Sequence, residues 1–350
     1  MKLTRKTILT RQKLFDANAT DEDTSVVGAK NTNLNNLSNI RYKWAKKLYD
    51  VMREENYWTP KIVDLTKDDK SKMDEAEREA HDDILGFLVF LDSLQTVNLP
   101  NIIDYISNAE IRGCLIEQTA QEFLHSESYQ TIFTTLYTQE EVDRIYYRFK
   151  ENEKLLNRTK FTTDIYQKFV DEPTLENFID VLIANILLEA MYFYMGFNFF
   201  YYLSSNNKME GEASMIRLIN IDEKTHIGIF AGIINAIKSQ ADDELKEYIK
   251  NRTIQITKEA MVYEIDWSVH TLRNISTFTE TDITAYIQYI AEKNVLRPIG
   301  YSIFEDVSNP YKHLEKIANI SKGTDNKGNF FESNSNSYIQ ASAINGYNSY

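Results

Sequence analysis

A short acid-and-histidine pattern that occurs twice constrains this chain more than any other feature. Glu122 and His125 are three positions apart, and Glu223 and His226 repeat that spacing. Residues three apart project from one face of an α-helix, so each pair presents a carboxylate and an imidazole side by side. Both pairs lie in apolar runs, where an unpartnered charge is costly to bury. Each pair is therefore expected to have a charged partner inside the fold.

A lone acid precedes each pair inside another apolar helix. Asp92 lies 30 residues before Glu122, and Glu189 lies 34 residues before Glu223. The order acid, Glu-x-x-His, acid, Glu-x-x-His is the ligand set of a carboxylate-bridged dinuclear metal site in a four-helix bundle. Two of only five histidines carry this pattern, so two unrelated solvated pairs are a poor explanation. The sequence predicts metal ligation by Asp92, Glu122, His125, Glu189, Glu223 and His226.

Few residues in this chain interrupt helices. Its 350 residues include 11 glycines and 5 prolines, and no segment of length alternates with the period of a strand. We therefore expect an all-α bundle, with the two pairs on helices over 101–137 and 210–240. Pro100 is expected to break the helix that carries Asp92, because the residue before a proline avoids helical geometry.

The composition also predicts a division of the chain into three parts. Residues 1–37 are polar and irregular, and residues 38–320 carry the helical pattern of the bundle. Residues 321–350 are rich in glycine, asparagine and serine and poor in aliphatic side chains. Such a segment buries too little apolar surface to fold alone, so a flexible C-terminal tail is expected.

Charge and hydropathy argue against several kinds of partner. The net charge is −13 and no basic stripe is present, so nucleic acid is not expected to bind. The most apolar run, 181–203, contains Asn185, Glu189 and Asn198, which favours a buried bundle helix over a membrane span. The N-terminus is polar and Cys114 is the only cysteine, so a cytoplasmic location is expected.

These motifs resemble those of the small, radical-generating subunit of class I ribonucleotide reductase, over roughly residues 40 to 340. The matching stretches are Leu-Asp-Ser-Leu-Gln at 91–95, Glu-Phe-Leu-His-Ser-Glu-Ser-Tyr at 122–129, Leu-Glu-Ala-Met-Tyr-Phe-Tyr at 188–194 and Ile-Arg-Leu-Ile-Asn-Ile-Asp-Glu-Lys-Thr-His at 216–226, with support from 57–60 and 264–267. The resemblance implies a ferritin-like helical bundle with the dinuclear centre in its core. It also implies the reduction of ribonucleotides to deoxyribonucleotides.

The resemblance assigns the six ligands to two metal ions. Asp92, Glu122 and His125 would bind one ion, and the other three ligands would bind the second. Glu122 and Glu223 are the candidates for bridging both ions. Oxygen ligands with one imidazole per ion suit two irons, two manganese ions or a mixed pair.

The resemblance also places a stable tyrosyl radical on Tyr129, four residues after His125. Its implied apolar pocket consists of Phe193, Phe197 and Ile219. An ordinary core tyrosine is the alternative, because the chain has 22 tyrosines and a buried phenol usually finds a hydrogen-bond partner such as Asp92.

A relay for the oxidising equivalent is implied by three further positions: Trp58, Asp222 and Tyr338. Trp58 has a plainer alternative as a packing residue at a helix end, and Asp222 could simply orient His125. In the tail, Tyr347 and Tyr350 compete with Tyr338 for the last step.

One cysteine cannot form the dithiol that ribose reduction needs, so the resemblance implies a large catalytic subunit that docks through the C-terminal tail. A homodimer is expected, and a manganese form would need a flavoprotein activator. Gln118 stands where some family members have a tryptophan, so an aromatic electron donor for cofactor assembly is not guaranteed at this position. Two other functions remain possible at this point: a related metal-bound ligand oxidase, and a ferritin-like iron-binding bundle.

Overall fold

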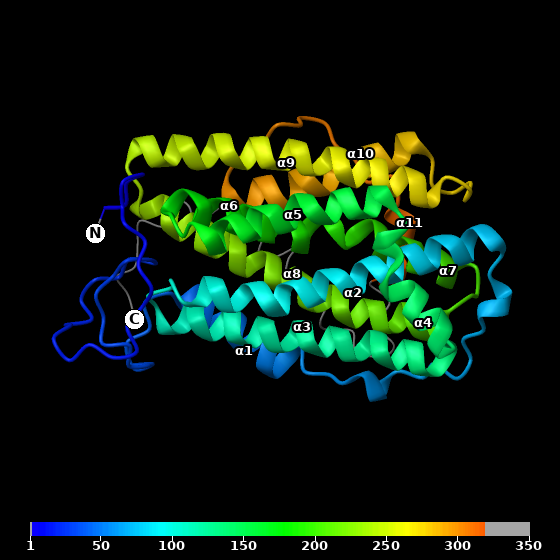
Figure 1. The fold of residues 1–350 in the computed structure, drawn as a ribbon, viewed down its shortest axis with the longest axis horizontal. Helices are drawn as coiled ribbons and strands as arrows, with labels where there is room; N and C mark the ends of the chain where they lie inside the picture. Colours follow the sequence, from blue (N-terminus) through cyan, green and yellow to red (C-terminus); the bar gives the residue numbers. More distant parts are fainter. Residues whose placement is uncertain (1, 319–350) are drawn as a thin grey trace.

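The computed structural model describes residues 2–318, which form long helices packed along a common direction (Figure 1). These residues contain no strand, only isolated bridges that pair Leu3 with Ala241 and Val27 with Ile106. The predicted all-α bundle is therefore confirmed. The expected tail and its candidate relay tyrosines, Tyr338, Tyr347 and Tyr350, lie outside the described residues.

The α-helices of the described residues range in length from 7 residues in α11 to 31 residues in α8. In chain order they are α1 (Lys43–Asp50), α2 (Glu75–Ile103), α3 (Ala109–Leu136), α4 (Gln139–Tyr146), α5 (Glu153–Asp171), α6 (Leu175–Leu187), α7 (Tyr194–Ser205), α8 (Glu210–Gln240), α9 (Asp243–Leu272), α10 (Glu280–Ile290) and α11 (Lys312–Ala318). Three π-helical segments interrupt or extend them: η1 (Val51–Glu55), η5 (Leu188–Tyr192) and η6 (Ala291–Leu296). Short 3₁₀ turns occupy η2 (Pro60–Ile62), η3 (Lys70–Lys72), η4 (Arg148–Lys150) and η7 (Arg297–Ile299).

Local sequence signals explain several helix ends. Asp74 and Glu77 form a reciprocal capping box at the start of α2, and Thr138 and Glu141 do the same for α4, which satisfies backbone N–H groups that have no partner in the first turn. The expected break at Pro100 is wrong, because α2 continues one turn further to Ile103. A proline this close to a helix end removes only one hydrogen bond near the end of the ladder.

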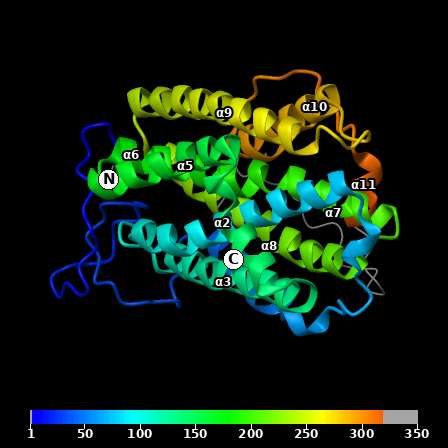
Figure 2. The same cartoon turned by 45° about the vertical axis from the view of Figure 1, so that its right-hand side comes forward.

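Four helical elements surround the centre of the bundle: α2, α3, α8, and α6 with its continuation η5. The antiparallel neighbours α2 and α3 pack together, α3 packs against α8, and α8 packs against α6 and η5. A second layer of α5 and α9 covers α6 on its outer side (Figure 2). The predicted metal ligands lie on the four inner elements.

The segments α6, η5 and α7 form one continuous apolar run. Among residues 2–318, this Leu175–Ser205 stretch is the one with the length and hydropathy of a membrane span, and 94% of its most apolar window is buried in the bundle. The expectation of a core helix there is confirmed. Burial on all sides explains why the stretch shows no polar face.

An irregular arm precedes α1 and lies over one end of the bundle (Figure 1). Its Leu3 N–H donates to the carbonyl of Gln240 at 2.8 Å, and Asp242 returns a bond to Leu3 at 2.9 Å. Further along the arm, the carbonyl of Val26 accepts from the N–H of Ser107 at 2.8 Å. These backbone bonds hold the arm against the loops at the ends of α2 and α8.

Candidate metal centre

The structure brings all six predicted ligands together in the core, and each is fully buried. Asp92 comes from α2, Glu122 and His125 from α3, Glu189 from η5, and the remaining two from α8. Their donor atoms form two groups, each with all members within 4.8 Å of one another. The groups are Asp92, Glu122, His125 and Glu223, and Glu122, Glu189, Glu223 and His226.

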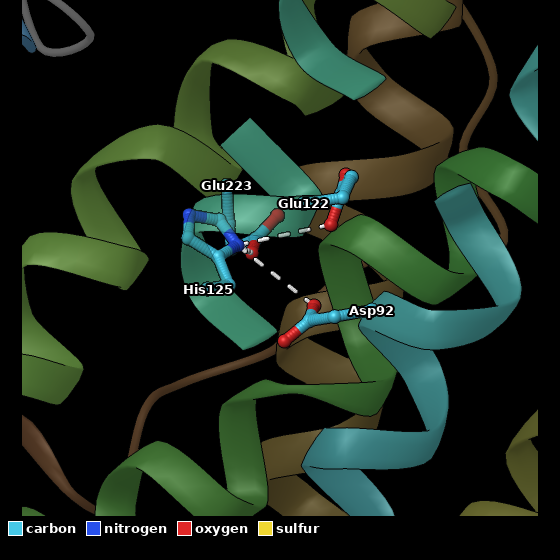
Figure 3. Close-up of side chains that lie close together, drawn as sticks. All are labelled: Asp92, Glu122, His125 and Glu223. Carbon is cyan, nitrogen blue, oxygen red and sulfur yellow. Dashed lines mark ion pairs between the residues drawn. The ribbon is translucent and has the colours of Figure 1, made fainter. Parts of the chain in front are cut away.

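Glu122 and Glu223 belong to both groups, and each divides its two oxygens between them. Oε2 of Glu122 lies 3.7 Å from Nδ1 of His125, while its Oε1 lies 3.2 Å from Nδ1 of His226. Oε1 of Glu223 lies 3.2 Å from His125, and its Oε2 lies 2.9 Å from His226. Figure 3 shows the first group, with the carboxylates of Asp92 and Glu122 turned toward the His125 ring. This is the arrangement that carboxylates bridging two cations require.

Both histidines direct Nδ1 into the cluster and Nε2 away from it. Nε2 of His125 lies 3.2 Å from Oδ2 of Asp222, and the Trp58 indole N–H donates to the same oxygen at 2.7 Å. Nε2 of His226 lies 3.0 Å from Oε1 of Gln121. Such outer partners fix the tautomer and ring orientation of a ligand histidine. Trp58, Asp222 and His125 thus lie in one chain of contacts, with Oδ2 of Asp222 between the indole and the imidazole.

Two amide side chains that sequence reasoning left without a role hold Glu189. Both Gln95 and Gln118 donate from Nε2 to Oε1 of Glu189, the latter at 2.8 Å, and Gln118 also reaches Oε1 of Glu122 at 3.1 Å. Gln95 in turn accepts from the hydroxyl of Tyr166 at 3.2 Å. A sequence signal existed, because Gln118 lies one helical turn before Glu122 on the same face.

Four carboxyl groups and two imidazoles share this cluster, and their pKa values shift in different directions. Burial raises the pKa of Asp92 and of Glu189 well above the ordinary range of a carboxyl. Burial would lower the pKa of His125 and His226, but the surrounding carboxylates instead raise it well above the usual value. Without cations, the cluster therefore balances its charge by holding protons on Asp92, Glu189 and the two imidazoles, and bound cations would replace those protons.

The unpaired atoms of the cluster test whether a metal fits. Among residues 2–318, six buried donor atoms of the cluster have no hydrogen-bond partner: Oδ1 and Oδ2 of Asp92, Oε2 of Glu122, Nδ1 of His125, Oε2 of Glu189 and Oε1 of Glu223. Buried polar atoms are normally paired, so a concentration of orphans in one place needs a cause. Carboxylate oxygens with one imidazole per site suit iron or manganese. The residues present fit a dinuclear iron or manganese centre.

Tyr129 and its predicted pocket residues are all buried. Tyr129 lies one turn beyond His125 on α3, and its hydroxyl has no hydrogen-bond partner within the described part of the chain. Burial raises the pKa of Tyr129 well above its usual range, and the nearby carboxylate of Asp92 raises it further. The rings of Phe193 and Phe197 stack with centroids 5.5 Å apart. The phenol is therefore neutral and shielded from water.

Comparison with known proteins identifies the family. A family model described as ribonucleotide reductase, small chain, matches residues 34–310. The ribonucleoside-diphosphate reductase subunit beta of Treponema pallidum (strain Nichols) is 35% identical over 344 residues, 97% of each chain. The ribonucleotide reductase R2 subunit from Clostridium botulinum is 34% identical with a TM-score of 0.83, over 89% of this chain and 99% of that one.

A more distant structure shares the fold alone. The X-ray structure of Streptococcus sanguinis dimanganese(II)-NrdF is 22% identical, with a TM-score of 0.72 over 81% of this chain and 99% of that one. The sequence matches above span nearly the whole of the chain and of its relatives. The chain therefore belongs to the ribonucleotide reductase small-chain family, as a small subunit of ribonucleoside-diphosphate reductase.

Proposed function

We propose that the six clustered residues bind two iron or manganese ions and that this chain generates and stores a tyrosyl radical on Tyr129. The observation that carries this proposal is the division of the oxygens of Glu122 and Glu223 between the two histidines. When bound, the two metal ions would supply the oxygen-activating redox chemistry. The protein supplies the ligands, the oxidisable phenol and the exclusion of water.

Tyr129 gives up one electron and its phenolic proton when it becomes a radical. Asp92 is the charged group that raises the pKa of Tyr129 most after burial itself. Both oxygens of Asp92 have no hydrogen-bond partner among the described residues. We assign Asp92 as the acceptor of the phenolic proton. The buried side chains of Phe193, Phe197 and Ile219 would keep water and reductants from the radical.

We propose that the oxidising equivalent leaves the core through Trp58, Asp222 and His125. Oδ2 of Asp222 accepts from the indole N–H of Trp58 and also faces Nε2 of His125. The rings of Trp58 and His125 are stacked with centroids 6.2 Å apart. Trp58 serving only as packing would not need this buried hydrogen bond to a carboxylate.

A small subunit of this enzyme works with a large catalytic subunit. We propose that the tail over 321–350 docks there and that Tyr338 carries the last step of the relay within this chain. Cys114, the only cysteine, is buried and donates to the carbonyl of Ala45 at 2.7 Å. It cannot supply a dithiol, so ribose reduction belongs to the partner.

We also propose that two copies of this chain associate through α2 and α3. Val97 on α2 is 70% exposed, and Ile116 and Phe123 on α3 are 58% and 62% exposed. The two α3 residues lie seven apart and so share a face. Exposed apolar patches of this kind mark association surfaces. A monomeric mass in sedimentation of the intact chain would contradict the homodimer.

General chemistry limits the choice of metal ions and favours one cellular location. Two irons, two manganese ions and a mixed pair all suit these ligands, and we propose that a manganese form uses a flavoprotein activator. We propose a cytoplasmic location, where a free buried thiol such as Cys114 stays reduced. Metal analysis of protein purified from its native host would identify the ions.

The radical assignment is tested with Tyr129→Phe in the metal-loaded chain. The change removes only the phenolic oxygen from a fully buried ring, so packing and metal content should be preserved. Electron spin resonance should show the loss of the tyrosyl signal, and ribonucleotide reduction with the large subunit should stop. A tyrosyl signal of normal intensity in this variant would show that another tyrosine holds the radical.

The tail is tested by ending the chain after Lys327. Every proposed ligand precedes Phe230, so metal content and the Tyr129 signal should remain while reduction with the large subunit disappears. A peptide spanning residues 330–350 should compete with the intact chain. Tyr338→Phe should dock but not turn over. Normal turnover in that variant, with a dead Tyr347→Phe or Tyr350→Phe, would move the relay to another tyrosine.

A further inference from the structure

A buried ion pair lies outside the metal centre and has no part in the proposed mechanism so far. Arg158 on α5 and Glu264 on α9 are both fully buried and form an ion pair. Burial raises the pKa of the Glu264 carboxyl to about 7, although the opposite charge of Arg158 acts to lower this pKa. Ser268 donates to the other oxygen of Glu264 at 3.2 Å. The pair thus holds two buried charged groups in the core, and burying them costs solvation free energy.

Aromatic rings enclose the guanidinium of Arg158. Its central carbon lies 3.4 Å from the ring centroid of Phe87, 4.0 Å from that of Trp267 and 4.8 Å from that of Tyr192. Arginine stacks well on aromatic faces because its charge is delocalised and weakly hydrated. The rings come from α2, α9 and η5, so this one side chain contacts three other helical elements.

Arg158 also reaches the backbone of the π-helical segment. Its Nη2 donates to the carbonyl of Tyr192, the last residue of η5, at 2.8 Å. Glu189 lies three residues earlier in the same π-turn. Phe87, the nearest ring to the guanidinium, lies five residues before Asp92 on α2. The pair is therefore connected to two of the ligand-bearing elements.

The energetics argue that this pair has a positional role. Replacing a buried ion pair with apolar side chains is often neutral or stabilising, so fold stability alone does not explain it. A π-turn holds one residue more than an α-helix of the same length. Reversion to regular α-helix would turn residues on one side of the turn by about 100°, the rotation per residue of an α-helix. Glu189 would then point away from Glu122 and Glu223.

We propose that Arg158, held by Glu264, is a positioning residue that fixes the π-helical register of Leu188–Tyr192 and thereby keeps Glu189 in the metal centre. The proposal rests on the ligand role proposed above for Glu189. It predicts that the pair acts on one metal position more than on the other, because Glu189 belongs to only one of the two donor groups.

The test uses the full chain, freed of metal, and a paired change that leaves no uncompensated charge: Arg158→Met with Glu264→Gln. A matched control is Arg252→Met with Asp180→Asn. Arg252 on α9 donates to Asp180 on α6 at 2.9 Å, and Asp180 lies nine residues before Glu189. Manganese(II) is titrated into each protein while electron spin resonance records free ions and coupled ion pairs.

The parent and the control should bind two manganese ions per chain and show the coupled-pair signal. The Arg158 double variant should bind one of the two ions roughly 10- to 100-fold more weakly, as for other groups that orient ligands, and lose the coupled signal. Arg158→Lys with Glu264 intact should recover part of the affinity, because it keeps the charge and one donor.

Three results would overturn the proposal: wild-type affinity and coupling in the double variant, equal weakening of both ions in step with lost helix content, or a double variant that does not fold. The last result would make Arg158 a folding residue. Failure of the parent chain to bind two ions is a separate result, and it would overturn the proposed centre itself.

Discussion

Two buried histidine clusters in this protein differ in how their polar atoms are satisfied. The first is the metal centre. The second, here called the His81 cluster, consists of His81 and its partners Glu212, Tyr137 and Asp82 at the α4 end of the bundle. His81 bonds Glu212 through Nε2 and the Tyr137 hydroxyl through Nδ1, both at 2.8 Å. The His81 ring and the Glu212 carboxylate are fully buried, as are the six ligands, so solvent cannot explain the difference between them.

The polar atoms of the His81 ring find their hydrogen-bond partners within the cluster. Both ring nitrogens are bonded, and the one orphan is Oε1 of Glu212, whereas the metal centre leaves six donor atoms without partners. One imidazole also balances one fully buried carboxylate there, while two imidazoles face four in the metal centre. The comparison teaches that buried charge alone does not indicate a metal site. Several unpaired donor atoms converging on one place do.

The largest expected effect that separates the clusters is that of His226→Ala. It removes one of the two imidazoles of the metal centre, so one metal position should weaken roughly 10- to 100-fold or more, given that loss of an outer partner already costs that much. Helix content by circular dichroism should stay nearly unchanged. Metal content is measured by elemental analysis after gel filtration. Full occupancy by two ions in this variant would exclude His226 as a ligand.

His81→Ala should do the reverse. It leaves Glu212 buried without its imidazole, and breaking one side of a buried pair costs about 3–5 kcal/mol of unfolding free energy. Metal content should remain that of the parent protein. Urea unfolding of the metal-free chains measures the cost, with His270→Ala as a control at a partly exposed histidine. Normal stability with lost metal would reverse the roles given to the two clusters.

A smaller effect is expected from pH. Burial would lower the pKa of His81, but the charge of Glu212 and the contact with Asp82 offset it and raise the pKa to about 9. The folded state thus binds this proton more tightly than the unfolded chain, whose histidine pKa is about 6.5. The resulting stability, on the order of 3 kcal/mol, is complete below pH 6.5 and lost as pH rises through 9.

The pH effect is measured as the difference in unfolding free energy between the parent and His81→Gln, both metal-loaded, from pH 6 to 10. Glutamine cannot gain a proton, so other titrating groups cancel in the difference. The advantage of the parent should shrink as pH rises. A constant difference across this range would show that His81 is neutral and that Glu212 is held by hydrogen bonding alone.

Much of the fold followed from local patterns. The start of α4 after Thr138 was predictable because its capping signal acts within a few residues. The start of α8 at Glu210 has no side-chain cap, so it followed from apolar periodicity alone. The break expected at Pro100 was wrong, because the packing of α2 against α3 outweighs the loss of one hydrogen bond near a helix end. The π-turn at η5 gave no sequence signal, since no residue type specifies it.

The sequence by itself determined which residues gather in the centre, because residue identity and the three-residue spacing are local properties of a helix. It also distinguished His81, which has Arg78 rather than an acid three residues earlier. Only the tertiary structure decided what surrounds the six ligands. Gln95 and Gln118 on Glu189, Gln121 on His226, and Arg158 against the π-turn are contacts between distant segments. Such contacts depend on how whole helices pack, and helical periodicity carries no information about that.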